Sequence, residues 1–349
     1  GAVSLFVNDT TKQSIYKKDT FIYGNMIYDK ALSKNYINLN LDKKFYQSSS
    51  KQYVQSFIEY EKKINSNIIE VHNRPNYIRL IKKNFKHKLI LYFHNDPLTM
   101  NGSKSTKDRL FLLNNIDKII FNSNWSKNRF FVNLPNKKLL EQKTSVCYQS
   151  APKTKIDFKK KEKIISFVGK LNSAKGYDLF GNAIIKILNK HNNWKAIVIG
   201  DEPREKLIFK HKNLTVAGFK NNTYILNFLK RVSISVVCSR WNEPFGRTSL
   251  EAASRGSAVI ISNRGGLPET AKDAIILKSL NSENLFNTIE KLIKNKNLLL
   301  NLQKKNYLHF EFNHKFITAI IDKIRKQLLP EKNFGLFNIK KNMVLKVLH

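Results

Sequence analysis

The stretch "ISVVCSRWNEPFGRTSLEAASRG" (residues 234–256) contains the pattern that decides the fold of this chain. It opens with a mainly apolar run of strand length, which is typical of a buried parallel strand. Glu243 then precedes a proline, which disfavours helical backbone, and Gly246 permits an unusual backbone angle. A helix is predicted over about 247–255, before a glycine. The stretch therefore predicts a strand, a loop at its carboxyl end, and a helix.

The same rhythm repeats through both halves of the chain. Short apolar runs alternate with longer segments of helical period, which indicates βαβ units and parallel sheets. Strands are predicted at 20–24, 67–71, 88–93, 118–121 and 144–149, and again at 164–169, 195–200, 214–218, 234–239, 258–262 and 274–277. Helices are predicted near 50–63, 76–84, 106–114 and 125–132, and near 177–190, 222–231, 247–255, 283–294 and 313–327. The expected fold class is α/β, with two doubly wound, Rossmann-like parallel-sheet domains.

A polar, basic stretch at 153–163 separates the two halves and is interpreted as an interdomain linker. We expect a first domain at 1–157, a second domain at 158–328, and a basic C-terminal tail at 329–349. Ligands of doubly wound sheets bind at the carboxyl ends of the strands. Two such domains are therefore expected to face a central cleft.

The composition is strongly basic. The 349 residues include 62 Lys and Arg against 26 Asp and Glu, a net charge of +36. This charge predicts attraction to nucleic acid, to an acidic membrane surface or to a phosphorylated substrate, with a compositional bias toward lysine as the alternative. No apolar run approaches the roughly 18 residues that a membrane span needs. Cys147 and Cys238 lie in apolar runs, so we expect buried free thiols in a reducing cytoplasm.

Two carboxylates lie in the opening stretch, Glu243 and Glu251, with seven residues between them. The predicted helix start leaves backbone N–H groups at 247–249 without intrahelical partners, which is an anion-binding arrangement. Both carboxylates can then face one ligand. A structural alternative is that Thr248 and Glu251 form a T-x-x-E capping box, with Glu243 as a solvated loop acid.

Two further loops follow predicted strands. In "SFVGKLNSAKG" (166–176), Lys170 and Lys175 flank a loop suited to holding a diphosphate, although the order of residues is not that of a P-loop. The stretch "SNRGGLPET" (262–270) is a glycine-paired loop after the next strand. Taken singly, each loop has an ordinary alternative. The two lysines are then only solvated side chains, and the glycine pair is only a turn.

Together, the three loops resemble the retaining nucleotide-sugar glycosyltransferases of family 4, which belong to the glycosyl transferases group 1 and have the GT-B fold. The family signature is matched by the two carboxylates in "EPFG…EA" and by "FVGKLNSAKG", with Lys170 where Arg is more usual. Its next landmarks are matched by "VIGDEP" (198–203), "VAGF" (216–219) and "GGLPE" (265–269). The resemblance covers about 164–325. It is weaker over the first domain, where "LYFHND" (91–96) and "FNSNWSKNRF" (121–130) are similar to family segments.

The resemblance implies a role for each of these residues. Lys170 and Lys175 would hold the donor diphosphate, Glu251 would bind the ribose hydroxyls, and Glu243 would contact the transferred sugar. Backbone N–H groups of Gly246, Arg247, Thr248 and Ser249 would meet the sugar or phosphate, and the backbone near Phe219 would flank the base. No metal or other cofactor is expected, and the sequence contains no Asp-x-Asp pair.

Residues of the first domain are expected to line the acceptor side. His94 ends a predicted strand and is placed against the donor sugar or acceptor, with a histidine that only caps its neighbours as the alternative. His72 and Arg74 end another strand, where Arg74 would hold an anionic acceptor. Gly1 resembles the family's turn glycine at the donor.

The start of the chain also carries an expectation. Val3, Phe6, Val7 and Thr10 have the spacing of one helical face after that glycine. In the family, a strand inside the first sheet precedes this turn. We therefore expect the natural protein to carry on the order of 10–20 further residues upstream. Without them, the first sheet is expected to lack a central strand.

These observations predict a retaining glycosyltransferase that moves a sugar from a nucleoside diphosphate sugar to an acceptor hydroxyl. The resemblance implies front-face attack in which the leaving phosphate helps to take the proton. The expected setting is cell-surface polysaccharide or lipid-linked glycan synthesis, in the cytoplasm or at the inner face of an anionic plasma membrane. The alternatives are a GT-B sugar phosphorylase or epimerase, and a basic nucleic-acid-binding protein. No basic helix interleaved with aromatic residues supports the last of these, and no nucleic-acid partner is expected.

Overall fold

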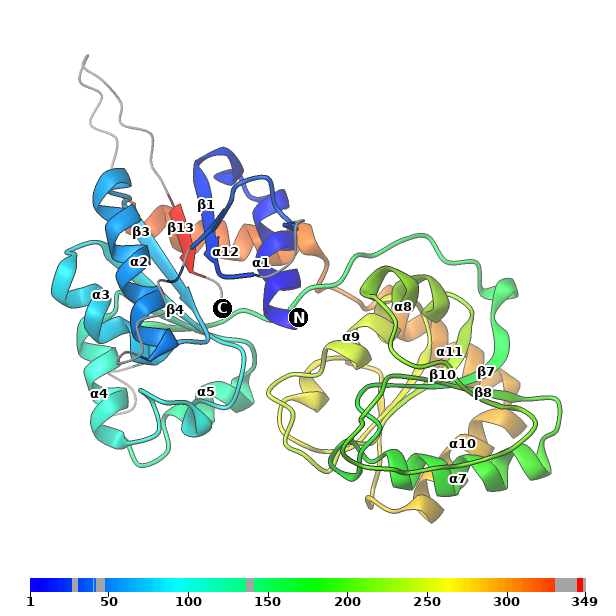
Figure 1. The fold of residues 1–349 in the computed structure, drawn as a ribbon. Coiled ribbons are helices and arrows are strands. Elements are labelled where there is room, and N and C mark those ends of the chain that lie inside the picture. The colour runs from blue at the N-terminus through cyan, green and yellow to red at the C-terminus, as the bar shows by residue number, and fades with distance from the viewer. Residues whose placement is uncertain (27–30, 40, 42–47, 136–140, 330–343, 348–349) are drawn as a thin grey trace. The chain divides into compact units, whose positions relative to one another are not determined.

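The chain divides into two compact units. The computed structural model describes residues 1–26, 31–39, 41, 48–135, 141–329 and 344–347. The first unit comprises Gly1–Gln149 together with His314–His349, and the second comprises Ser150–Asn313 (Figure 1). Each unit is a parallel sheet covered by helices, which confirms the predicted α/β class.

The sheet of the first unit has the strand order β2-β1-β13-β3-β4-β5-β6, and every neighbouring pair is parallel. Its strands are β1 (Thr20–Gly24), β2 (Tyr36–Asn38), β3 (Ile68–His72), β4 (Lys88–Phe93), β5 (Lys118–Phe121), β6 (Thr144–Val146) and β13 (Val344–Val347). Its helices are α1 (Ala2–Gln13), α2 (Ser49–Ile64), α3 (Ile78–Asn84), α4 (Thr106–Asn115), α5 (Asn124–Phe130) and α12 (His314–Leu328). In β4, every residue after the first is buried, as expected for a parallel strand covered on both faces.

The sheet of the second unit has the order β12-β11-β10-β7-β8-β9, again entirely parallel. Its strands are β7 (Glu162–Val168), β8 (Lys195–Ile199), β9 (Leu214–Val216), β10 (Val232–Val237), β11 (Ala258–Ile261) and β12 (Ile275–Ile276). Its helices are α7 (Tyr177–Lys190), α8 (Asn222–Leu229), α9 (Arg247–Ser254), α10 (Ser282–Lys294) and α11 (Lys296–Leu308). Because β10, β7 and β8 are neighbours, the loops that follow them meet at one edge of the sheet.

Most elements lie where the sequence predicts them, but β2 and α11 were not predicted. Strand β2 is only three residues long and none of them is buried, so it carries no apolar alternation. Three of the four residues predicted to form the inner face of α1, Phe6, Val7 and Thr10, are buried, whereas Val3 is only partly buried. Cys147 and Cys238 are buried free thiols, as expected, and burial raises the pKa of each to about 12.

The position of β13 corrects the expectation of an incomplete first sheet. This strand comes from the segment assigned to a basic tail, and it pairs in parallel with β1 on one side and β3 on the other (Figure 1). The sheet is therefore continuous through the position that an upstream strand was expected to occupy. Residues 330–343 and 348–349 of that tail lie outside the described residues.

The domain boundaries expected at residues 157 and 328 are also corrected. Helix α12 was assigned to the second domain, but it packs against α1 in the first unit. Arg325 explains this placement, because its fully buried guanidinium is paired with both carboxylate oxygens of Glu70 on β3, at 2.7 and 2.9 Å. It also pairs with Asp322 at 2.9 Å, and Asp322 accepts a hydrogen bond from the Ser14 hydroxyl. A buried charge that needs these partners fixes the helix to the first sheet.

Candidate functional site

The loop after β10 turns sharply at Gly246 before α9 begins. Gly246 is the N-cap of the helix, with a φ of 120°, a region that favours glycine. Glu251 is the fifth residue of α9 and therefore lies just beyond its first turn. The alternative of a Thr248–Glu251 capping box is wrong, because Gly246 and not Thr248 caps the helix. The carboxylate of Glu251 is thus available for another role.

The glycine pair of "GGLPE" is joined to the backbone of Glu243. The Gly266 N–H donates to the Glu243 carbonyl at 2.6 Å, and Glu243 and Gly265 form an isolated parallel bridge. Gly265 has a φ of 62°, and a Cβ there would overlap the backbone of Glu243. This close approach requires glycine, so the two loops predicted separately from the sequence form one structure.

The lysine loop lies against the same edge. The Lys175 ammonium forms an ion pair with the Glu243 carboxylate, and the two side chains are 32% and 13% exposed. The N–H groups of Arg240 and Trp241 donate to the carbonyl of Ala174, at 2.9 and 3.0 Å. The loop after β7 is therefore held against the loop after β10. Lys175, which was predicted to bind the diphosphate, contacts Glu243, which was predicted to contact the sugar.

Lys170 is placed differently from Lys175. It follows the last residues of β7 and is exposed. Its side chain has no hydrogen bond or ion pair with any residue that the structure describes. It is therefore a solvated cation at the rim of the same edge, and its ammonium group remains available to a ligand.

Glu251 is nearly buried and is held by two donors. Arg247 Nε donates to its Oε1 at 2.7 Å from the same helix, and Asn222 Nδ2 donates to the same oxygen at 2.8 Å from α8. Asn222 was missed by sequence reasoning, because an asparagine at a helix start carries no signal beyond capping. Phe219 lies three residues earlier, in the segment between β9 and α8, and is 74% exposed.

The first unit contains a buried pair of histidines. His72, at the end of β3, and His94, after β4, bring Nδ1 and Nε2 to 3.1 Å. Tyr92 stacks on the His72 ring at a centroid distance of 4.2 Å, and Phe6 meets His94 edge-on at 5.1 Å. Burial first, and then the nearby His72, hold the pKa of His94 well below its usual range. His94 is therefore neutral near pH 7, and its ring pairs with His72 instead of capping its neighbours.

The other first-unit candidates are less enclosed. Arg74 is half-buried and donates to the Asn73 carbonyl at 3.0 Å. Asn73, with a φ of 61°, accepts the N–H groups of His94 and Asn95 and so joins the ends of β3 and β4. Gly1 is exposed at the N-cap of α1, and no atom would obstruct a Cβ there. The structure thus gives no steric reason for glycine at this position.

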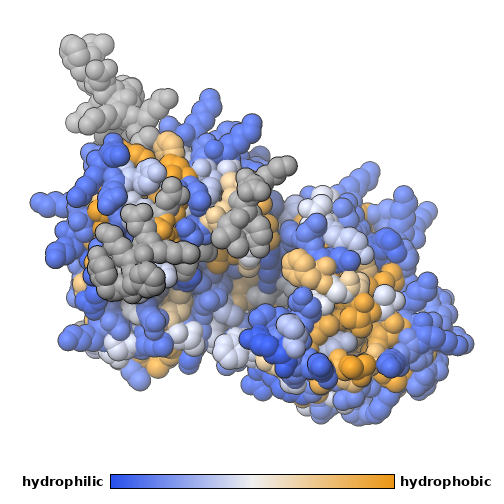
Figure 2. All heavy atoms as spheres, viewed as in Figure 1, coloured by the Kyte–Doolittle hydropathy of each residue, from blue (hydrophilic) through white to orange (hydrophobic). Residues whose placement is uncertain are grey.

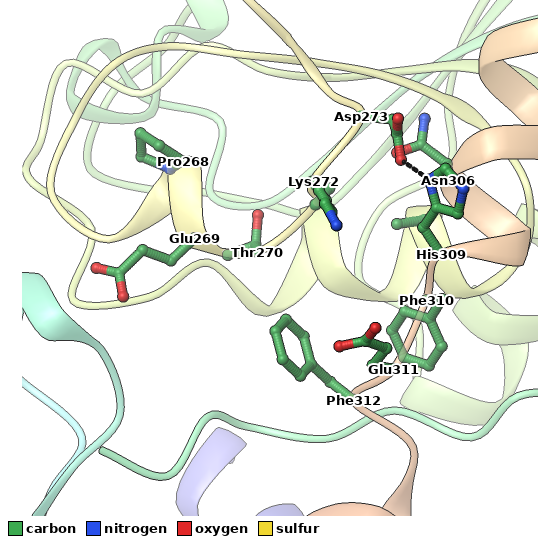
Figure 3. A pocket seen from close by; sticks show the side chains of 12 residues that line it. Pro268, Glu269, Thr270, Lys272, Asp273, Asn306, His309, Phe310, Glu311 and Phe312 are labelled. Atoms are coloured by element: carbon green, nitrogen blue, oxygen red, sulfur yellow. Dashed lines mark hydrogen bonds and ion pairs between the residues drawn. The ribbon is translucent and has the colours of Figure 1, made fainter. Parts of the chain in front are cut away.

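A separate cavity of about 250 Å³ lies in the second unit beside the segment that follows the glycine pair, because Pro268 and Glu269 are among its lining residues (Figure 3). Its walls include Thr270, whose hydroxyl is 2.7 Å from that of Ser249 in α9, and Phe312, which contacts Phe245 of the "EPFG" loop. Figure 3 shows the ion pair between Asp273 and His309 at one end, 2.7 Å long. No sequence pattern predicted this cavity.

The described residues contain no group of three or more His, Cys, Asp or Glu side chains that could hold a metal ion. None of the helices in the described parts of the chain has the length and apolar character needed to cross a bilayer. Figure 2 shows hydrophilic side chains over much of the visible face of both units.

Comparison with known proteins identifies the second unit. Residues 150–309 match the family model for glycosyl transferases group 1. The Bacillus subtilis (strain 168) protein YtcC, which carries a glycosyltransferase name, is 23% identical over 372 residues, covering 95% of this chain and 89% of YtcC. The lipopolysaccharide core biosynthesis mannosyltransferase LpcC of Rhizobium leguminosarum bv. viciae is 32% identical over 116 residues, 30% of this chain and 33% of LpcC.

The fold is shared with solved structures over nearly the whole chain. Anabaena Alr3699/HepE, solved in complex with UDP-glucose, has a TM-score of 0.72 at 16% identity, covering 94% of this chain and 96% of that one. The second unit therefore matches the glycosyl transferases group 1 family model over residues 150–309, in a chain with the GT-B fold.

Proposed function

We propose that this chain is a retaining glycosyltransferase of the family 4 type, which transfers a sugar from a nucleoside diphosphate sugar to an acceptor hydroxyl. One observation carries the proposal: Lys175 and Glu243, from the loops after β7 and β10, form an ion pair, and Glu251 lies in the helix that follows the same β10 loop, where it contacts Asn222 at the start of α8. Carboxylates accept hydrogen bonds from sugar and ribose hydroxyls, and an ammonium group binds phosphate oxygens. A nucleoside diphosphate sugar presents all three of these groups.

Each residue then has a defined task. Lys170 and Lys175 bind the diphosphate, and the backbone N–H groups at the start of α9 add to its stabilisation. A bound diphosphate competes with Glu243 for Lys175 and thereby frees the Glu243 carboxylate for the sugar. Glu251 accepts the ribose hydroxyls, and the segment at Phe219 flanks the base. The cations that stabilise the leaving diphosphate in this proposal belong to the protein, so we expect transfer to proceed without an added metal.

The first unit is proposed to bind the acceptor. Nε2 of His94 faces His72, so its Nδ1, which is buried without a hydrogen-bond partner among the described residues, is the nitrogen proposed to bond an acceptor hydroxyl, and the neutral ring brings no charge to it. His72 holds its ring in place. Arg74 is proposed to meet an anionic acceptor.

The proposed setting is the synthesis of cell-surface polysaccharide or lipid-linked glycan in the cytoplasm. LpcC is named for lipopolysaccharide core biosynthesis, and HepE was solved with UDP-glucose. The HepE complex supports a nucleotide-sugar donor here, and the name of LpcC supports a glycan acceptor. The net charge of +36 supports a peripheral position on an anionic membrane, where a lipid-linked acceptor is found.

The test is a screen of UDP-, GDP- and ADP-sugars for donor turnover, with proton NMR of the product to read its anomeric configuration. We expect one donor to be consumed, the configuration of the transferred sugar to match that of the donor, and the rate to survive EDTA. An inverted product would exclude the retaining mechanism, and loss of activity in EDTA that Mg²⁺ restores would exclude the metal-free one.

Glu243→Gln tests the observation that carries the proposal. The variant keeps the shape of the side chain but removes its charge, so we expect turnover to fall about 100-fold or more, with melting unchanged. Glu283→Gln on α10 removes an exposed carboxylate and is the matched control. Full activity in Glu243→Gln would remove this acid from the reaction.

A further inference from the structure

Two donors converge on a single oxygen of Glu251. Asn222 Nδ2 and Arg247 Nε lie 2.8 and 2.7 Å from Oε1. A carboxylate only accepts hydrogen bonds, so the amide nitrogen of Asn222 must be the atom that faces it. Asn221 caps α8 by accepting the Tyr224 N–H at 2.9 Å, which fixes the helix start that carries Asn222.

The second oxygen of Glu251 is left for a ligand. Among the described residues, no donor reaches Oε2, although the side chain is only 5% exposed. A carboxylate has about four lone-pair sites, and here the protein occupies those of one oxygen only. Burying an ionised group with half of its acceptor capacity unused is costly unless a partner arrives. Two neighbouring hydroxyl groups, such as those of a ribose, are suitable donors.

We propose that Asn222 is a positioning residue for nucleotide binding, which holds the Glu251 carboxylate so that Oε2 faces the ribose hydroxyls. The inference rests on the proposed function and adds a residue to it. Arg247 is on the same helix as Glu251, so its contact cannot fix that helix relative to other segments. Asn222 belongs to α8, immediately after the segment with Phe219, and therefore ties the ribose-binding acid to the segment proposed to flank the base. Asparagine does this without adding a second positive charge to that of Arg247, which already forms an ion pair with Glu251.

The experiment measures equilibrium binding of whichever of UDP, GDP and ADP raises the melting temperature most, and of its 2′,3′-dideoxy analogue. The variants are Asn222→Ala, which removes the side chain, and Asn222→Asp, which keeps its shape but replaces the donor with an acceptor. Asn227→Ala is the matched control, an exposed asparagine on the same helix. We expect both Asn222 variants to bind the diphosphate about tenfold more weakly, which is the typical loss for a hydrogen bond to a charged group. Their affinity for the dideoxy analogue should equal that of the unmodified protein.

The dideoxy comparison separates positioning from folding. A general loosening of α8 would weaken both ligands equally and would overturn the inference, as would normal binding in Asn222→Asp. If the unmodified protein binds none of the three nucleotides, the proposed function itself fails. If it binds one and Asn222→Ala changes nothing, only the inference fails.

Discussion

Lys161 is a lysine inside the second unit that is held by backbone carbonyls instead of a carboxylate. Its ammonium group donates to the carbonyls of Leu229, Val232 and Arg255, at 3.1, 2.8 and 2.7 Å. Burial first, and then the charge of Arg255, lower its pKa to about 7, against an ordinary value of 10.5. Between these two values, the unfolded chain binds a proton that the folded chain releases.

This difference predicts a pH-dependent stability. Below pH 7, both states carry the proton and the fold bears the full cost of the buried charge; that cost is relieved as pH rises from about 7 to 10.5. The free energy of unfolding should therefore rise with pH in this window, relative to Lys161→Met. Urea unfolding of both proteins from pH 6.5 to 9.5 measures the difference. Parallel pH profiles would show that Lys161 stays protonated in the fold.

At the scale of single residues, the candidate residues that could be predicted are those whose position depends on nearby sequence alone. Glu243, Lys175 and the glycine pair were identified because each lies at a fixed distance from a strand end or a turn. The predicted capping box is wrong because the N-cap of α9 is Gly246, two positions before Thr248. Asn222 gave no signal, since its partner Glu251 belongs to another element and only the folded sheet brings the two together.

At the scale of elements, local pattern predicted helices and strands but not all of their partners. The amphipathic face of α12 is compatible with packing on either unit. Its buried Arg325 pairs with Glu70 of β3 and so places the helix on the first unit. Strand β13 was missed because a short run in a basic segment looks like a tail, and its place between β1 and β3 depends on residues far away in sequence.

Arg325 offers a direct test of how α12 is held. Arg325→Met leaves the buried carboxylates of Glu70 and Asp322 without this cation, so we expect a loss of about 3–5 kcal/mol in the free energy of unfolding. Lys326→Met, at the neighbouring exposed position, should leave it unchanged. Chemical denaturation of the three proteins is the measurement. Equal free energies of unfolding for Arg325→Met and the unmodified protein would show that the ion pairs of Arg325 make no net contribution to stability.

The central place of β13 can be tested through its backbone. Leu345 pairs with Phe21 on one side and Ile69 on the other, so Leu345→Pro removes an N–H from the middle of the sheet. We expect the first unit to melt several degrees lower, with the second unit unaffected. Leu345→Ala keeps the N–H and is the control for the side chain. Identical melting of the proline and alanine variants would refute a central strand at this position.

At the scale of the whole molecule, charge and fold answer different questions. The net charge of +36 was compatible with nucleic acid, membrane or phosphorylated substrate, and no reading of composition separated them. The loops of the second unit favour a phosphorylated substrate, because they contain carboxylates that we propose to bind hydroxyl groups and lysines that we propose to bind phosphate. Much of the remaining charge lies on exposed lysines away from these loops, such as Lys17 and Lys18 beside Ile15, which is 76% exposed.

That remaining charge predicts salt-sensitive binding to anionic membranes. Each lysine near an acidic lipid surface contributes roughly 1 kcal/mol, and the attraction falls off within a Debye length of about 8 Å at physiological ionic strength. We expect the protein to co-sediment with phosphatidylglycerol-containing vesicles at low salt, to be released as NaCl is raised to about 0.5 M, and to ignore pure phosphatidylcholine vesicles. Nuclease treatment beforehand removes nucleic acid that would bridge or mask the same lysines. Binding that persists at high salt would point to inserted apolar side chains in place of charge, and absence of binding at low salt would show that the basic surface serves another anionic partner.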